Sequence, residues 1–238
     1  MKRLLLSILA FHFAFLLNAQ GLVEFSLLAG PNKTSPQEIS SGVVLLPDLS
    51  TGLGSFQNQS GDSFNLGAIL GWQFLPEKAW MFKSGVFYSR MNFSTYVTSE
   101  SLDKFYFVSN SQKVQQWELP LFLAYKTSLG KFELGIDFGL IKSIYIDSDI
   151  QQNEIWKEPN TEPAFSPNLF RTSGFVPILD KFSFYISPFI QRNISESIGI
   201  TIQPYYRRQI GSERSHLYTK NTGSINQFGI NFGLVKQF

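Results

Sequence analysis

The stretch Trp117-Glu-Leu-Pro-Leu-Phe-Leu-Ala-Tyr-Lys126 alternates between two kinds of side chain, and so does the next, Phe132-Glu-Leu-Gly-Ile-Asp-Phe-Gly139. In the first stretch large apolar residues occupy every second position, while Glu118 and Lys126 lie on the opposite face. A period of two is typical of a β-strand whose two faces meet different surroundings. Residues 128–131, Ser-Leu-Gly-Lys, have the composition of a turn. The two stretches therefore predict a β-hairpin with one apolar face.

Similar alternation recurs along the chain and predicts eight strands in all. Besides the hairpin, the clear segments are 63–74, 197–208 and 225–238, and the weaker ones are 21–30, 81–93 and 181–193. In 81–93 both faces carry large residues, because Phe87 and Met91 oppose Phe82, Val86 and Tyr88. The pattern there does not decide which face is inward.

The connections between these segments alternate in length. The long ones are 31–62, 94–113, 146–180 and 210–224, and the short ones are 75–80, 127–130 and 194–196. Outer-membrane barrels have this arrangement, with long extracellular loops, short periplasmic turns and both termini in the periplasm. The sequence therefore predicts an all-β fold, an eight-stranded antiparallel transmembrane β-barrel in the outer membrane of a Gram-negative bacterium. A soluble periplasmic barrel is the structural alternative.

The first residues have the pattern of a secretory signal. Lys2 and Arg3 precede an apolar run at 4–17, and Ala19 supplies a small residue for cleavage. A membrane anchor is the alternative, but the run is shorter than the ~20 residues that cross a bilayer as a helix. We expect a signal peptide at 1–19 and one barrel domain at 20–238.

The composition restricts the function. Aromatic residues make up 16% of the chain, which suits a protein that places rings at lipid interfaces. Without Lys2 and Arg3, the 20 basic residues fall to 18 and equal the 18 acidic ones, so a nucleic-acid partner is not expected. The absence of cysteine excludes disulfides, thiolate catalysis, cysteine zinc sites and lipoprotein acylation. No cofactor is expected.

Three features resemble a known family: the signal ending Asn18-Ala19-Gln20, the hairpin at 117–139 and the alternating final strand that ends at Phe238. With them the chain resembles the PorT-like family of small outer-membrane β-barrel proteins, distantly akin in architecture to the OmpA and OmpX barrels. The resemblance implies that Phe238 is an assembly signal for the barrel-assembly machinery. The family includes an accessory of a secretion system, but no motif here is specific to that role.

Charged residues on the polar faces of the strands are expected to point into the barrel. They are Glu24, Lys83, Glu118, Lys126, Glu133, Asp137 and Arg207. Paired carboxylates can do acid–base chemistry. However, an eight-stranded barrel is only wide enough for its own side chains. We therefore expect a structural ion-pair network that plugs the interior.

The loops contain the remaining candidate residues. His216 is the one histidine of the mature chain and lacks an obvious triad, and Asp147, Asp149 and Glu154 lack the spacing of a calcium loop. No catalytic residue and no metal site is therefore expected. Loop aromatics either pack within the loops and extend the strands or meet a partner; they are Phe105, Tyr106, Phe107, Trp156, Phe165 and Phe170.

The leading functional hypothesis is a non-enzymatic structural or accessory subunit that docks with other envelope proteins, in a secretion or assembly complex. Its expected partners are outer-membrane lipids, the barrel-assembly machinery and other envelope proteins. The alternatives are a narrow channel or ligand-uptake barrel and, third, a lipid-modifying or proteolytic barrel enzyme centred on His216.

Overall fold

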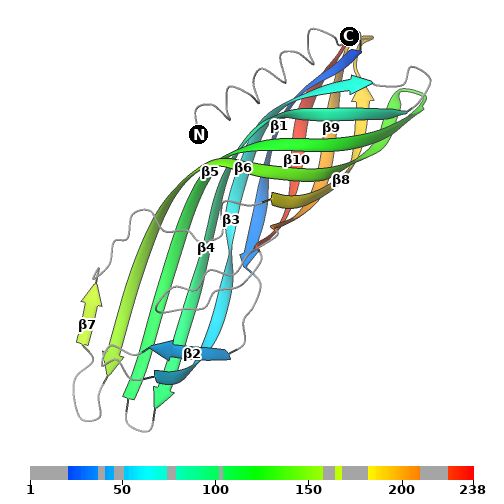
Figure 1. The fold of residues 1–238 in the computed structure, drawn as a ribbon. Coiled ribbons are helices and arrows are strands. Elements are labelled where there is room, and N and C mark those ends of the chain that lie inside the picture. The colour runs from blue at the N-terminus through cyan, green and yellow to red at the C-terminus, as the bar shows by residue number, and fades with distance from the viewer. Residues whose placement is uncertain are drawn as a thin grey trace.

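The computed structural model describes residues 21–36, 41–45, 51–73, 79–101, 104–157, 164–167, 182–209 and 225–238. Nearly all of these residues lie in ten antiparallel strands (Figure 1). The strands are β1 Leu22–Pro36, β2 Ser41–Leu45, β3 Thr51–Gln73, β4 Trp80–Ser101, β5 Lys104–Leu129, β6 Phe132–Lys157, β7 Ala164–Pro167, β8 Phe182–Asn193, β9 Ile198–Gln209 and β10 Ile225–Gln237. Within the described ranges, no helix is long and apolar enough to span a membrane.

Eight of these strands close into a barrel. The order is β1-β3-β4-β5-β6-β8-β9-β10, and β1 closes the ring because it pairs with both β3 and β10. The main-chain nitrogen of Phe238 donates to the carbonyl oxygen of Val23 at 3.1 Å, so the last residue is part of the closed sheet. The eight-stranded antiparallel barrel is confirmed. The short β2 and β7 pair with β3 and β6 outside the ring.

The eight strands differ in length. The strands β1, β8, β9 and β10 have 12 to 15 residues, whereas β3, β4, β5 and β6 have 22 to 26. The strand β6 pairs with β8 only up to Lys142, so its remainder lies beyond the ring. Figure 1 shows the four long strands running on together past the short ones. We call their outer part, residues 51–60, 93–101, 104–113 and 149–157, the extension.

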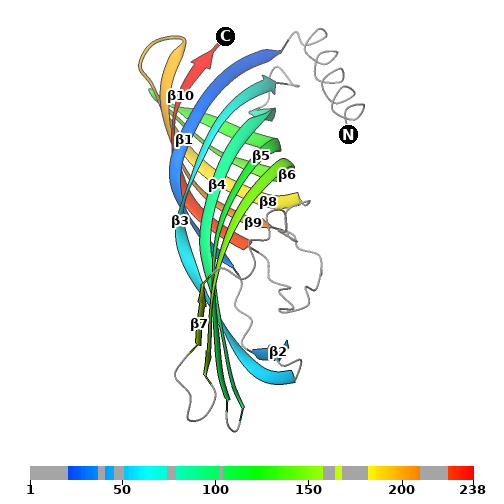
Figure 2. The same ribbon diagram turned by 90° about the vertical axis from the view of Figure 1, so that its left-hand side faces the viewer.

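Two irregularities mark the place where the extension leaves the barrel. The register of β3 and β4 shifts between Ser60 and Phe64, and that of β5 and β6 shifts between Trp117 and Glu118. A β-bulge bends its strand and increases the local twist. In Figure 2 the long strands curve as they leave the ring.

The prediction of long loops in these connections is largely wrong. Residues 94–113 continue the β4–β5 hairpin, and only 102–103 fall outside its strands. The predicted loop at 31–62 contains the end of β1, all of β2 and the start of β3. Much of the predicted loop at 146–180 belongs to β6 and β7, while 210–224 lies outside the described residues. In stretches such as 98–101 and 109–113 polar residues follow one another directly, so a hydrophobic period does not reveal these strands.

Short turns occupy the other end of the barrel. The turn between β5 and β6 uses Gly130, whose φ of 65° favours glycine. Ile194 and Ser195 donate main-chain hydrogen bonds to the carbonyl oxygen of Ile198 and so close the β8–β9 turn. Below, "turn end" means the end with these turns and the chain terminus, and "loop end" means the end with the extension.

The outward face of the ring is an apolar belt of exposed leucine, isoleucine and phenylalanine side chains. Aromatic pairs border it at both ends. Trp80 lies 5.1 Å from Tyr125 at the turn end, and Tyr88 lies 5.3 Å from Trp117 at the loop end, measured between ring centroids. On β5, the span from Trp117 to Tyr125 rises about 20 Å at a strand tilt of about 40°. Membrane barrels have an apolar band of about 25 Å between two aromatic girdles.

Candidate functional site

The inward residues of the ring form a charged cluster near the turn end. Lys83 lies at its centre, with its Nζ 3.0 Å from Oε1 of Glu24 and 3.3 Å from Oδ1 of Asp137. All three side chains are at most 3% exposed. They come from β4, β1 and β6, so the cluster joins strands that are distant in sequence. Buried charges require partners of this kind.

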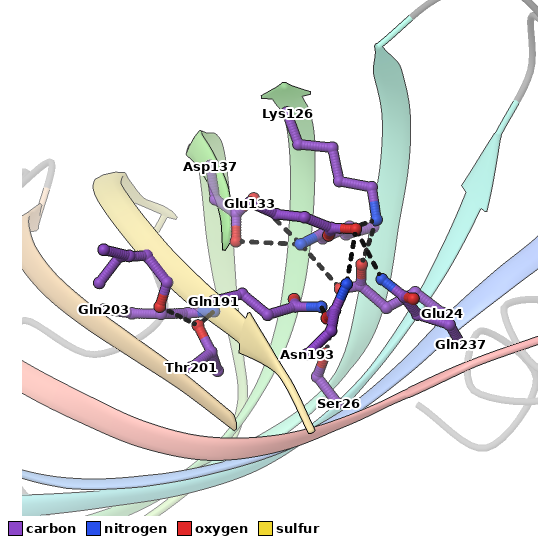
Figure 3. Close-up of polar contacts among 12 residues, drawn as sticks. Glu24, Ser26, Lys126, Glu133, Asp137, Gln191, Asn193, Thr201, Gln203 and Gln237 are labelled. Carbon is purple, nitrogen blue, oxygen red and sulfur yellow. Dashed lines mark hydrogen bonds and ion pairs between the residues drawn. The ribbon is translucent and has the colours of Figure 1, made fainter. Parts of the chain in front are cut away.

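A second lysine continues the cluster toward the barrel mouth. Nζ of Lys126 lies 3.3 Å from Oε2 of Glu24 and 3.1 Å from Oε2 of Glu133. The Asn193 and Gln237 side-chain amides donate to Oε1 of Glu133 at 3.4 and 3.0 Å (Figure 3). The Lys126 side chain is 22% exposed, so this part of the cluster reaches water. The cluster therefore has a buried core and a wetter rim.

A layer of apolar and aromatic side chains lies above the charged cluster. The ring of Tyr185 stacks on Phe122 at 4.5 Å and on Tyr205 at 5.4 Å, measured between centroids. The buried members of this layer, which we call the aromatic layer, are Leu28, Ile69, Phe87, Phe122, Ile141, Tyr185 and Tyr205. The polar faces of the strands were expected to point inward, and this layer shows that large apolar and aromatic side chains point inward as well. It also shows that Phe87 and Met91 face inward on β4.

The aromatic layer separates the turn-end cluster from a second polar group toward the loop end. There Nη1 of Arg207 lies 2.7 Å from Oε1 of Glu118, and its Nη2 donates to Oγ of Ser183 at 3.0 Å. Gln116 also donates to Glu118. The Arg207 and Glu118 side chains are 6% and 1% exposed, so this ion pair is shielded from water.

Neutral side chains complete this second group. The Asn32 amide donates to Oδ1 of Asn65 at 3.1 Å, and the Asn65 amide donates to Oδ1 of Asn231 at 2.8 Å. The Tyr205 hydroxyl donates to Oδ1 of Asn65 at 2.9 Å, which joins this group to the aromatic layer. The interior is thus filled with interacting side chains from every strand of the ring.

The seven charged residues predicted to point inward all do so. However, they form two groups rather than one network, because Glu118 and Arg207 pair at a different height from the other five. The aromatic rings between the groups were not predicted from the sequence. Tyr185 and Phe122 belong to strands with large residues on both faces, so alternation alone gave no sign of them.

The extension has a polar outward face where its side chains are described. Ser55 and Thr98 share a hydrogen bond of 2.5 Å, and the Tyr96 hydroxyl donates to Oε1 of Gln59 at 2.7 Å. The ring of Phe107 stacks on Tyr96 at 6.1 Å. Further exposed residues of the same face are Gln57, Ser111 and Lys113. This face suits contact with water, unlike the apolar belt on the same strands.

The predicted loop aromatics lie mostly in strands. Phe105, Tyr106 and Phe107 belong to β5, and Trp156 belongs to β6, where its backbone pairs with that of Tyr106. Phe165 belongs to β7, beside Ile155 of β6. Phe170 lies outside the described residues. Several of these aromatics are therefore brought onto neighbouring strands of one sheet.

The candidates for chemistry are not brought together. His216 lies outside the described residues, and Asp147, Asp149 and Glu154 belong to β6 rather than to a loop. Within the part of the chain that the structure describes, no three side chains of the metal-binding types form a group that could hold an ion.

No protein-family model matches the chain, and no curated protein matches it. Among solved structures, the outer-membrane protein OprG of Pseudomonas aeruginosa is 13% identical, with a TM-score of 0.40, and the match covers 92% of this chain and 98% of that one. The Ail attachment invasion locus protein of Yersinia pestis is 12% identical, with a TM-score of 0.38, over 91% and 99%. Neisserial surface protein A is 7% identical, with a TM-score of 0.37, over 90% and 97%.

Proposed function

We propose that this chain is a non-enzymatic outer-membrane barrel that presents the extension outside the cell as a docking surface for another envelope component. The turn end and the chain terminus then face the periplasm. The apolar belt with its two aromatic girdles supports the membrane placement, because such a surface would be unfavourable in water.

The docking role is inferred from the length of four consecutive strands, β3 to β6. A strand crosses a bilayer with about 9–11 residues. The strands β3 to β6 have 22 to 26 residues, so about half of each lies beyond the belt. A sheet of this size, with exposed polar side chains on one face, is far more than is needed to connect the strands of a barrel. Because its backbone is paired in regular strands, this sheet can present side chains to a partner in fixed positions.

The filled interior supports an accessory role over transport. The aromatic layer lies across the barrel, and the charged groups on both sides of it are paired. Membership of the PorT-like family, and a place in a secretion or assembly complex, stay predictions within this proposal. So do the assembly role of Phe238 and the signal peptide.

Photo-crosslinking tests the docking role. A photoreactive residue at Gln57 or Ser111, on the exposed face of the extension, is expected to give a discrete protein adduct in the native cell. The same residue at Leu123 in the belt is the matched control and should react with lipid. Mass spectrometry identifies the adducts. Failure of both extension positions to capture a protein, with Leu123 still reacting with lipid, would contradict the docking role.

Planar-bilayer recording tests the channel alternative. We expect the purified full-length protein to give no discrete conductance steps, because Phe122, Tyr185 and Tyr205 stack across the interior. A monomeric eight-stranded barrel is filled by its own side chains. Reproducible unitary steps that disappear when the protein is omitted would favour the channel instead.

A further inference from the structure

Two prolines face each other across the barrel wall between β8 and β9. The pairing of these strands lapses over residues 187–189 of β8 and 203–205 of β9, which we call the gap. The register on either side of the gap places Pro188 opposite Pro204 at its centre. Both prolines are exposed on the outward face, within the apolar belt.

The gap follows from the chemistry of proline. In an antiparallel pair, opposite residues alternately exchange two main-chain hydrogen bonds and none. The nitrogen of Ile194 donates to the carbonyl oxygen of Ile198 at 2.8 Å, which shows that the even-numbered residues of β8 and β9 make the exchanged bonds. At Pro188 and Pro204 both bonds are missing, because proline has no N–H. About 13 Å of the two strands therefore has no main-chain bond between them.

The other prolines of the ring disturb their ladders less. Pro31 of β1 lies opposite Ile230 of β10, and Pro120 of β5 lies opposite Gly85 of β4. Each of these partners has an N–H, so one of the two exchanged bonds can still form. Among the described strands of the ring, β8 and β9 are the one neighbouring pair in which two prolines meet.

A serine hydroxyl bridges the gap. Oγ of Ser187 donates to the carbonyl oxygen of Pro204 at 2.9 Å, and it lies 3.5 Å from the carbonyl oxygen of Pro188. The Ser187 side chain is fully buried on the inward face. A hydroxyl has one hydrogen to donate, so Ser187 replaces one of the two missing donors. It thereby links the two strands where their main chains do not.

The interior behind the gap carries no charge. The inward side chains of the gap are Ser187, Phe189, Gln203 and Tyr205, and Tyr205 stacks on Tyr185 of the aromatic layer at 5.4 Å. Oε1 of Gln203 is buried and has no hydrogen-bond donor among the described residues. The closed wall thus leaves acceptors incompletely satisfied. An opening at this height would expose aromatic rings to the lipid rather than an ion pair.

We propose that the barrel wall opens and closes between β8 and β9, and that the Ser187 hydroxyl is the latch that holds it closed. Opening at the gap breaks one side-chain hydrogen bond and no main-chain bond, whereas any regular part of the wall would lose its ladder bonds. The open wall makes the aromatic layer accessible from the side of the barrel. This device depends on the pairing of the ring and not on the docking role of the extension.

Amide hydrogen exchange of the full-length protein in lipid nanodiscs, resolved by NMR, tests the opening. The amides that donate across β8 and β9 on either side of the gap are those of Ile186, Ile190, Ile202 and Tyr206. Thr201 and Gln203 are the matched controls, because they lie on β9 but donate to β10. Because opening spreads outward from the gap, the four flanking amides are expected to exchange at least about tenfold faster than the controls. Equal rates would overturn the proposal.

Variants test the latch. Ser187→Ala is expected to speed exchange at the four flanking amides by about tenfold, and Ser187→Thr, which keeps the hydroxyl, should match the wild type. Pro204→Ala restores an N–H facing the Pro188 carbonyl and should slow the same amides by about tenfold. Pro120→Ala, on the ladder between β4 and β5, should leave them unchanged.

Local and global effects are distinguishable in the same spectra. Unchanged exchange at Thr201 and Gln203 establishes that a variant keeps the barrel folded. If Ser187→Ala speeds the flanking and control amides equally, or speeds neither, the latch is overturned. Such a result would leave the docking role of the extension intact, because photo-crosslinking at Gln57 and Ser111 tests that role separately.

Discussion

Replacing Lys83 with methionine is expected to destabilise the barrel by about 3–5 kcal/mol, because it leaves buried carboxylates without their counter-charge. Lys83 lies within 3.0 Å of Glu24 and 3.3 Å of Asp137, and its side chain is 3% exposed. Urea unfolding in lipid vesicles, followed by tryptophan fluorescence, measures the change in free energy.

Lys126→Met is the matched control for this prediction. Lys126 also contacts Glu24, but its side chain is 22% exposed at the barrel mouth, where water can solvate the remaining charge. The loss should therefore be smaller. Adding Glu24→Gln and Asp137→Asn to Lys83→Met should recover part of the stability, since the unpaired charges are removed together. A Lys83→Met barrel as stable as Lys126→Met would show that the buried cluster does not support the fold.

Replacing Leu121 with arginine is expected to cost about 2–4 kcal/mol, the range for a basic residue at the bilayer midplane of a membrane barrel. Leu121 is 37% exposed and lies midway between the girdle residues Trp117 and Tyr125 on β5. The same unfolding experiment in vesicles gives the value. The physical reason is the transfer of a charge into hydrocarbon rather than any lost contact within the protein.

Ser111→Arg provides the control on the same face of the same strand. Ser111 is exposed in the extension, which is proposed to lie in water, so its replacement should change the stability by less than about 0.5 kcal/mol. Equal costs at the two positions would mean that the belt does not lie in a membrane.

The hairpin at 117–139 and the eight-stranded ring were predictable from the sequence. Lipid and interior impose opposite demands on successive residues, so Leu119, Leu121 and Leu123 alternate with side chains that face inward. The turn around Gly130 was predicted from the composition of residues 128–131, and the number of strands from the number of alternating segments. The inward positions of Glu118, Lys126 and Asp137 were predictable for this reason too.

The extension was not predictable in the same way. Many outward positions of its strands are polar, for example Ser94, Thr98 and Ser111. Such positions do not produce the alternation of apolar and polar residues that identifies a strand in the sequence. Polar residues with little alternation look like a loop. Only the pairing of the four strands with one another shows that 94–113 continues the sheet.

The layering of the interior depends on register. The heights of Glu118 and Arg207 relative to Lys83 are set by the stagger between strands that are far apart in sequence. Periodicity identifies the face of a residue but not its height. For this reason the charged residues could be assigned to the interior, whereas their division by the aromatic layer could not.

Single-cysteine labelling tests the central claim, that the belt lies in the membrane and the extension lies outside it. The chain has no cysteine, so each variant carries one reporter. With a membrane-impermeant maleimide on intact cells, Ser111→Cys is expected to react rapidly and Leu121→Cys to stay protected. Ser128→Cys, at the turn end, should react only after the outer membrane is disrupted. Rapid labelling of Leu121→Cys, or labelling of Ser128→Cys but not Ser111→Cys on intact cells, would contradict the account.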